Sequence, residues 1–198
     1  MTSAGSDLAA ERERAVAACL DDIRAILGAA DVNRATLERV KGRLLALAAR
    51  RDLFSYAQFP LRHERSTMHV LAEDDGDGLA LYAVTAQGES ATPPHDHTTW
   101  AVVVGVEGEE RNKLWRRIDD GATPGKAQLE EVDETVVGRG TGVALMPDDI
   151  HSIHRGSDVP LLHFHLYGHS IERLGERKQF DLEHGTYEVY PANPNIHR

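Results

Sequence analysis

The sequence predicts a mainly β protein, an antiparallel barrel or sandwich, preceded by a pair of α-helices. Apolar residues recur at three-to-four spacing through the first fifty residues, which is the period of an amphipathic helix. Beyond Phe54 the apolar residues form short runs separated by turn signals, at roughly 8 to 12 residue spacing. We expect a helical segment over residues 1–52 that packs on the barrel, and a barrel over residues 53–198 that includes a C-terminal tail.

Two amphipathic helices account for the N-terminal segment. Their apolar stripes are interrupted at "GAADVNRA", which we interpret as the connection between them. The pattern leaves open whether these helices cover one end of the barrel or mediate pairing of subunits, and it does not give the oligomeric state. The two stripes consist of Val16, Leu20, Ile23 and Leu27, followed by Leu37, Val40, Leu44, Leu45 and Leu47.

The predicted strands follow in order along the rest of the chain. The runs are "MHVLAE", "LALYAVTA" and "WAVVVGV", and later "VVGRGTGVALMP" and "VPLLHFHLYG". The final segment, "FDLEHGTYEVYPANPNIHR", predicts one more short strand and then a tail that contains prolines. No GxGxxG motif, P-loop or internal repeat is present.

Composition excludes several classes of function. The net charge is −10, and lysine and arginine do not cluster, which argues against nucleic acid and anionic membranes as partners. The first residues mix acids with arginines, unlike a secretory or transit peptide, and no apolar run approaches the ~20 residues that cross a bilayer. We therefore expect a soluble, cytoplasmic protein. The single cysteine, Cys19, excludes an internal disulfide and a cysteine-based zinc site, and we expect it to be a small buried residue of a helix.

Histidines are concentrated in two segments. In "TPPHDHTTWAVVVG", His95 and His97 would share one face of a strand while Asp96 points the other way, so the two imidazoles could chelate one ion. The alternative is an exposed polar loop. His151 follows a Pro-Asp-Asp turn, where a third imidazole could join the first two. His154, at an odd offset from His151, would face away from it, so we do not expect His151 and His154 to be ligands together.

The segment "HFHLY" carries a second set of polar side chains. His163, His165 and Tyr167 alternate with Phe164 and Leu166, so the two imidazoles and the phenol share a face. Inside a barrel they would need hydrogen bonds or a nearby metal. The alternative is the polar surface of an edge strand.

Together, "PPHDHTTWAVVVGVEG", "PDDIHSIH" and "HFHLYG" resemble the cupin superfamily, and within it the cysteine dioxygenase-like thiol dioxygenases. The resemblance covers roughly residues 55 to 180 and implies a cupin, or jelly-roll-like, β-barrel. Ordinary metal cupins complete their site with a glutamate, at a position that here holds Val102 or Ala101. Iron sites made of three histidines without a carboxylate are what the thiol dioxygenases have, in contrast to the two-histidine, one-carboxylate triad.

The resemblance also implies the chemistry. His95, His97 and His151 would bind Fe(2+), and both atoms of O₂ would be added to the sulfur of a small thiol to give a sulfinic acid. The hydroxyl of Tyr167 would reach the bound oxygen or the substrate, and His165 would orient that hydroxyl. The expected partners are therefore a small-molecule thiol and O₂.

The chain departs from this family at three positions. The cysteine that cross-links to the tyrosine in some members corresponds to the region of Val102, and a serine of the tyrosine relay is replaced by His163. The arginine that binds a substrate carboxylate aligns with His69. Some bacterial members place that arginine after the tyrosine, and a bidentate arginine suits a carboxylate. The predicted substrate-binding residues are His69, His163, Arg173 and Arg177, with Arg62 and Arg65 as further candidate arginines.

The substrate itself stays open at this point. A thiol like 3-mercaptopropionate is one expectation, and a bulkier imidazole or cationic thiol, such as a thiol-histidine betaine, is another. Two alternative functions share the fold: a different three-histidine metalloenzyme, such as a hydrolase, lyase or carbon-cleaving dioxygenase, and a non-catalytic cupin that binds a small molecule. Tyr167 favours the thiol dioxygenase, since a barrel without catalysis has no need of a buried phenol beside a metal.

Overall fold

The computed structural model describes residues 3–76, 78–156, 158–190 and 196–198. Two α-helices, α1 (Ser3–Gly28) and α2 (Arg34–Ala48), begin this part of the chain. Asn33 caps α2, because its side-chain oxygen accepts a hydrogen bond of 3.0 Å from the amide of Thr36. The predicted break between the helices thus contains the capping residue that starts the second one.

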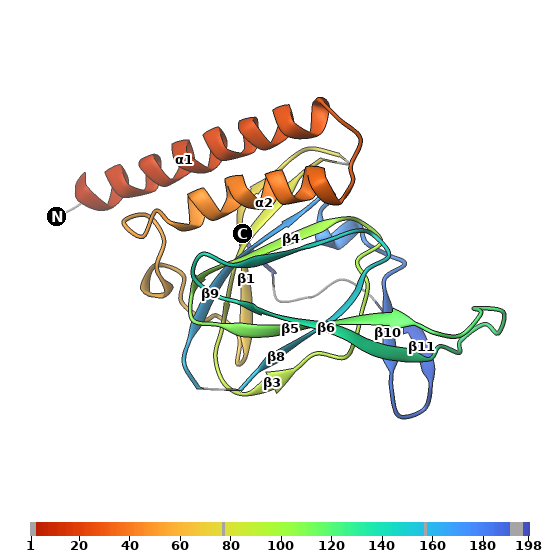
Figure 1. Ribbon diagram of the computed structural model, residues 1–198. Coiled ribbons are helices and arrows are strands. Elements are labelled where there is room, and N and C mark those ends of the chain that lie inside the picture. Colours follow the sequence, from red (N-terminus) through yellow and green to blue (C-terminus); the bar gives the residue numbers. More distant parts are fainter. Residues whose placement is uncertain (1–2, 77, 157, 191–195) are drawn as a thin grey trace.

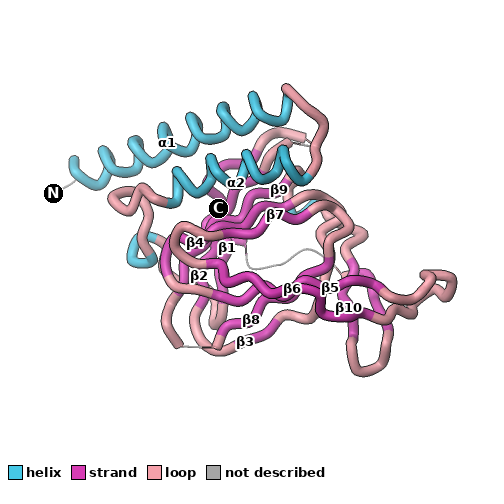
Figure 2. Tube along the Cα trace, viewed as in Figure 1, coloured by secondary structure: helices cyan, strands magenta, loops and turns pink. Residues whose placement is uncertain are grey.

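Two β-sheets face each other and form a barrel (Figures 1 and 2). The larger sheet has the order β12 (Ile196–His197), β1 (Ser66–Glu73), β2 (Ala80–Ala86), β9 (Leu161–Tyr167), β4 (Ala101–Glu107) and β7 (Gly142–Leu145). The smaller has the order β3 (Ser90–Ala91), β8 (Ile150–Arg155), β5 (Glu110–Arg117) and β6 (Leu129–Val137). Apart from the parallel contact of β1 with β12, the pairs in both sheets are antiparallel.

Shorter elements complete the described chain. A hairpin of β10 (Lys178–Asp181) and β11 (Thr186–Val189) projects from one side of the barrel (Figure 1). Two 3₁₀ turns are η1 (Tyr56–Gln58) and η2 (Ile171–Arg173). The predicted fold class, a mainly β, jelly-roll-like barrel with an N-terminal pair of α-helices, is confirmed.

The two faces of the larger sheet have different roles. Its outer face packs against the helices in one apolar core, where Phe164 makes an edge-to-face contact with Phe54 at 4.8 Å between ring centroids. Figure 1 shows both helices lying across this sheet, so they cover a face of the barrel rather than one of its ends. The inner face carries Tyr82, Val103 and Tyr167, which belong to a second core inside the barrel.

The sequence analysis missed several strands, among them β5 and most of β6. The outer faces of β5 and β6 are charged and carry cross-strand ion pairs, Arg111 with Glu134 at 2.6 Å and Lys113 with Glu131 at 2.8 Å. Such strands lack the apolar runs on which the prediction depended. The run predicted over residues 136–147 is in fact two strands, because β6 ends at Val137 and β7 begins at Gly142.

Other expectations are settled by position. Cys19 is buried in α1, with 3% of its surface exposed, as predicted. The last predicted strand is present as β11, whereas the prolines of the tail, Pro191 and Pro194, lie outside the described residues. None of the described helices is both long and apolar enough to span a membrane.

Candidate metal centre and cavity

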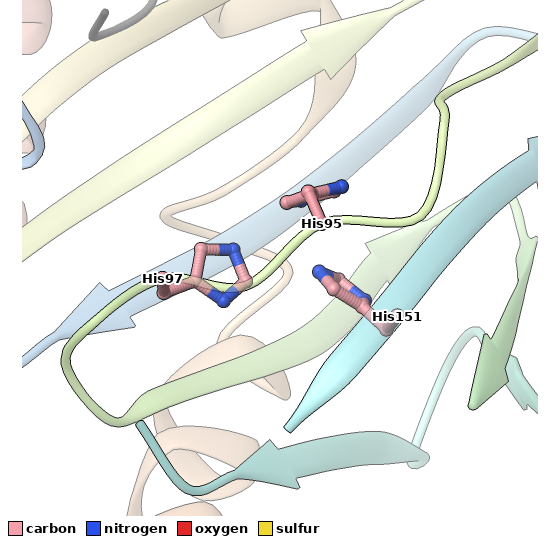
Figure 3. A group of neighbouring side chains, drawn as sticks. All are labelled: His95, His97 and His151. Atoms are coloured by element: carbon pink, nitrogen blue, oxygen red, sulfur yellow. The ribbon is translucent and has the colours of Figure 1, made fainter. Parts of the chain in front are cut away.

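Three imidazoles converge inside the barrel. His95, His97 and His151 each offer a ligand atom, and these atoms lie within 4.8 Å of one another. The ring centroids are 4.5 Å apart for His95 and His151, 4.9 Å for His97 and His151, and 5.0 Å for His95 and His97. Figure 3 shows the three rings around a common space, two from one loop and the third from β8. All three side chains are buried, so the alternative of an exposed polar loop is excluded. Their burial and convergence fit a metal site.

The backbone explains how His95 and His97 come to point the same way. The sequence predicted a regular strand here, but the two residues lie in an extended segment between β3 and β4. His95 bridges to His151 on one side and to Gln179 on the other, which fixes the segment between β8 and β10. Thr98 then turns the chain in the left-handed region, at φ 56°, where a non-glycine residue is strained. Asp96 points away from the imidazoles and accepts a hydrogen bond from the amide of Lys178, as predicted.

Hydrogen bonds hold two of the imidazoles from behind. Nδ1 of His151 donates to Oδ1 of Asn112 at 2.8 Å, and Nδ1 of His95 donates to the carbonyl of Pro93 at 3.0 Å. Each contact leaves Nε2 with its lone pair available, the tautomer a metal requires. Nε2 of His151 and Nδ1 of His97 have no hydrogen-bond partner among the described residues. Buried polar atoms are rarely left so, and a bound metal ion would account for such a nitrogen.

The electrostatics favour neutral imidazoles. Burial lowers the pKa of His95 to about 4, and burial together with the neighbouring imidazoles lowers the pKa values of His97 and His151 well below the usual range. Neutral nitrogen is the form that binds a metal. The residues present therefore fit a divalent metal ion, and the donor set of three imidazoles does not by itself decide between iron, zinc and nickel.

The row on β9 faces the same interior. β9 lies between β2 and β4 and is buried along its whole length, so the alternative of an edge strand is excluded. Phe164 and Leu166 pack toward the helices. Nδ1 of His165 lies 3.1 Å from the hydroxyl of Tyr167, whose ring centroid is 5.4 Å from that of His97. Burial raises the pKa of Tyr167, so its hydroxyl stays protonated.

A cavity of about 470 Å³ opens beside the three histidines. His165 and Tyr167 line it, and so does Arg177, with 5% of its surface exposed. The guanidinium of Arg177 donates to the carbonyl of Asp96 at 3.4 Å and lies 4.5 Å above the ring of Tyr190. A positive charge is thus held at the metal end of the cavity.

Other predicted site residues lie elsewhere. His69 is on the outward side of β1, between the rings of Phe59 and His197, and it is not part of the described cavity wall. Arg173 lines a separate surface pocket, and Arg62 and Arg65 are exposed and are not among the described residues that line the cavity. The structure therefore does not bring these residues to the three histidines. The physical reason is the period of two in a strand, which turns His69 away while Met68 faces inward.

His163 and His154 lie near the candidate metal centre, but neither lines the described cavity beside it. His163 is completely buried on the inner side of β9, but it is not among the described residues that line the cavity. His154 bonds to the hydroxyl of Ser152 at 2.8 Å and lines a different pocket, so it is absent from the described histidine group, in agreement with the odd-offset argument.

Sequence reasoning missed two buried polar residues at the site. Asn112 is completely buried and orients His151, and its amide donates to Oε1 of Glu110 at 3.1 Å. Glu110 is also buried and lines the cavity. The alternation in "ERNKL" does place both on one face of an extended segment, but nothing in the charged run "EGEERNKLWRR" distinguishes this face from a solvated one.

Comparisons with known proteins give no activity. No protein-family model matches the chain, and no curated protein matches it. An oxalate oxidase structure aligns over 46% of this chain and 42% of its own, with 16% identity and a TM-score of 0.36. The lyase DddQ from Ruegeria pomeroyi DSS-3, which acts on DMSP, aligns over 60% and 56%, with 20% identity and a TM-score of 0.40.

A third solved structure is hydroquinone 1,2-dioxygenase PnpCD in complex with Cd2+ and 4-hydroxybenzonitrile. It aligns over 63% of this chain and 74% of its own, with 11% identity and a TM-score of 0.42. The chain spans about half the length of the first two proteins. The three names denote three different reactions, and none of them is assigned to this chain.

Proposed function

We propose that the protein is a non-heme iron(II) thiol dioxygenase, which converts a thiol and O₂ into the corresponding sulfinic acid. The observation that carries the proposal is the position of Tyr167, a buried phenol held by His165 beside a carboxylate-free group of three histidines. A metal site with only a structural role has no use for a phenol that faces the same cavity. Both atoms of O₂ enter the product, so the reaction needs no further reductant.

The metal would be held by His95, His97 and His151. When bound, iron(II) would supply coordination positions for a thiolate and for dioxygen, together with the redox chemistry that joins them. Three neutral imidazoles add no negative charge, so the site attracts an anionic sulfur more strongly than a carboxylate-containing site would.

The side chains of the protein prepare the substrate. Arg177 places a positive charge at the metal end of the cavity, where we propose that it favours the thiolate form and contacts the substrate. Tyr167 keeps its proton at neutral pH because burial raises its pKa, so it can donate a hydrogen bond toward an anionic group. His165 fixes the direction of that hydroxyl. We propose that His163, which is buried on the same side of β9 but does not line the described cavity, does not contact substrate.

The test is a panel of thiols. The iron(II)-loaded protein is incubated in air with 3-mercaptopropionate, cysteine, cysteamine and a thiol-histidine betaine, while O₂ uptake and sulfinate are measured. We expect at least one thiol to consume O₂ and yield its sulfinate in equal amounts, and the zinc-loaded protein to consume none. Stoichiometric iron with no thiol-dependent uptake would refute the proposal and favour another three-histidine metalloenzyme or a binding protein.

A further inference from the structure

Two charged side chains line the cavity where β5 begins and β8 ends. Glu110, the first residue of β5, and Arg155, the last residue of β8, both line it. The two strands are antiparallel neighbours, with Arg111 paired to His154, so Glu110 and Arg155 stand opposite each other at the end of this ladder. A carboxylate and a guanidinium are thus presented together to the cavity.

Neither group is fully used by the protein. Glu110 is 5% exposed; it accepts from Asn112 at 3.1 Å and has Nδ1 of His163 at 3.4 Å. A carboxylate accepts up to about four hydrogen bonds, so capacity remains. Arg155 donates to the hydroxyl of Ser90 at 2.8 Å, which occupies only part of its fork of donors.

The surroundings of Glu110 also contain an incompletely satisfied imidazole. His163 is completely buried, and neither of its ring nitrogens makes a hydrogen bond of good geometry among the described residues. Buried polar groups normally have partners, and an ionised carboxylate in such a place is costly unless it meets a cation or several donors. Arg155 already presents a cation to Glu110, and both side chains keep unused hydrogen-bonding capacity. This part of the cavity therefore suits a ligand that carries both a cationic donor and an anionic acceptor.

Arg155 is well separated from His151 along β8. Arg155 lies four residues beyond His151 on the same strand, which corresponds to ~13 Å along the backbone. Apolar side chains, Val84, Ile153 and Leu161, line the cavity as well. A volume of about 470 Å³ falls in the range of sites for drug-sized ligands, so a three-carbon thiol would leave much of it empty.

We propose that the substrate is an extended thiol with an α-amino-acid-type group at the end remote from sulfur. The sulfur lies at the three histidines, an apolar spacer crosses the cavity, the ammonium meets Glu110 and the carboxylate meets Arg155. This proposal rests on the proposed thiol chemistry for the reaction at sulfur, but it assigns the recognition of the substrate to residues other than the proposed metal ligands.

The experiment measures binding without turnover. The protein is loaded with Co(II) under anaerobic conditions, where a sulfur-to-cobalt absorption band reports coordination of a thiol. The probes are ω-thiol α-amino acids of increasing chain length, starting from cysteine, with matched thiols that lack the amino group or the carboxylate. We expect the affinity to rise with chain length to an optimum longer than cysteine.

Variants then test each contact. Glu110→Gln keeps an acceptor for Asn112. It should lower the affinity for the optimal thiol by about 10- to 100-fold and leave the affinity for the matched thiol without an amino group unchanged. Arg155→Met should lower the affinity for the optimal thiol by a similar factor and leave the affinity for the matched thiol without a carboxylate unchanged. It gives an independent test if the first variant folds poorly. Glu109→Gln, at the exposed neighbouring position, is the control and should change neither.

The outcomes separate the two proposals. Tighter binding of 3-mercaptopropionate than of every longer amino-acid thiol, or an equal effect of Glu110→Gln on all probes, would overturn the substrate assignment even if the iron protein oxidises short thiols. Glu110-dependent binding to the cobalt protein, without O₂ uptake by the iron protein on the same thiol, would support the assignment and refute the dioxygenase.

Discussion

Replacement of Asn112 by leucine tests how the metal site is held. Asn112 accepts from Nδ1 of His151 at 2.8 Å and donates to Glu110 at 3.1 Å, and all three side chains are buried. Leucine has a similar volume but no polar atom. His151 would lose the contact that selects its tautomer and fixes its ring, so its Nε2 would no longer be directed at the metal in a single orientation.

The expected magnitude follows from these contacts. Loss of a hydrogen-bond partner behind a ligating histidine weakens metal binding by about 10- to 100-fold, which corresponds to roughly 1.4 to 2.7 kcal/mol. The metal-free protein should also lose about 1 to 3 kcal/mol of stability for each buried group left without a partner. Competition with a chelator for Co(II) or Zn(II) measures the first effect, and denaturant unfolding of the metal-free protein measures the second.

A control separates the two effects. Thr85→Val also removes a buried polar group, but Thr85 bonds to Thr67 and His69 outside the cavity. We expect this variant to lose stability and keep its metal affinity. If Asn112→Leu folds and binds metal as tightly as the parent, Asn112 does not orient a ligand, and the assignment of His151 as a ligand is refuted with it.

Three further outcomes are expected. His97→Ala should abolish metal binding, whereas His154→Ala should retain it; metal content after dialysis decides, and the reverse pattern would exchange their roles. Tyr167→Phe should keep its iron and lower thiol-dependent O₂ uptake by about 10² or more, and loss of iron would show that the residue is misplaced. Burial raises the pKa of Cys19 from 9.0 to about 11. Because the pKa of Cys19 is higher in the folded state than in the unfolded state, the buried thiol contributes its full stability below the unfolded pKa. This contribution is lost as the pH rises from the unfolded to the folded pKa. Native Cys19 should therefore resist thiol reagents at mildly alkaline pH, which rapid labelling of the native protein would contradict.

Local patterns predicted most of the fold. The helices were predicted because a period of 3.6 is visible within a single segment. The larger sheet was predicted because strands such as β4 and β9 are buried on both faces and carry apolar runs. In the smaller sheet, β5 and most of β6 were missed because one face of each is covered by charges, which in a sequence resemble a solvated loop.

Within the site, the alternation of side chains predicted which residues share a face of a strand, but not whether that face points into the barrel. It grouped His163, His165 and Tyr167 correctly on one side of β9. It could not tell that His69 points outward, because which side of β1 meets the interior depends on the pairing of β1 with β2. Nor could it tell that, among the four candidate arginines, Arg177 lines the described cavity whereas Arg62, Arg65 and Arg173 do not.

The sequence alone therefore determined the chemistry available: a His-x-His pair, a later histidine after a turn, and a row that ends in a tyrosine. The tertiary structure decided how these groups meet. His151 joins His95 only because β8 is bridged to the preceding loop, and Asn112 and Glu110 join them only through the register of β5 on β8. Side-chain periodicity is a property of neighbouring residues, whereas the register between strands depends on hydrogen bonds and packing between segments distant in the chain, and no local pattern records it.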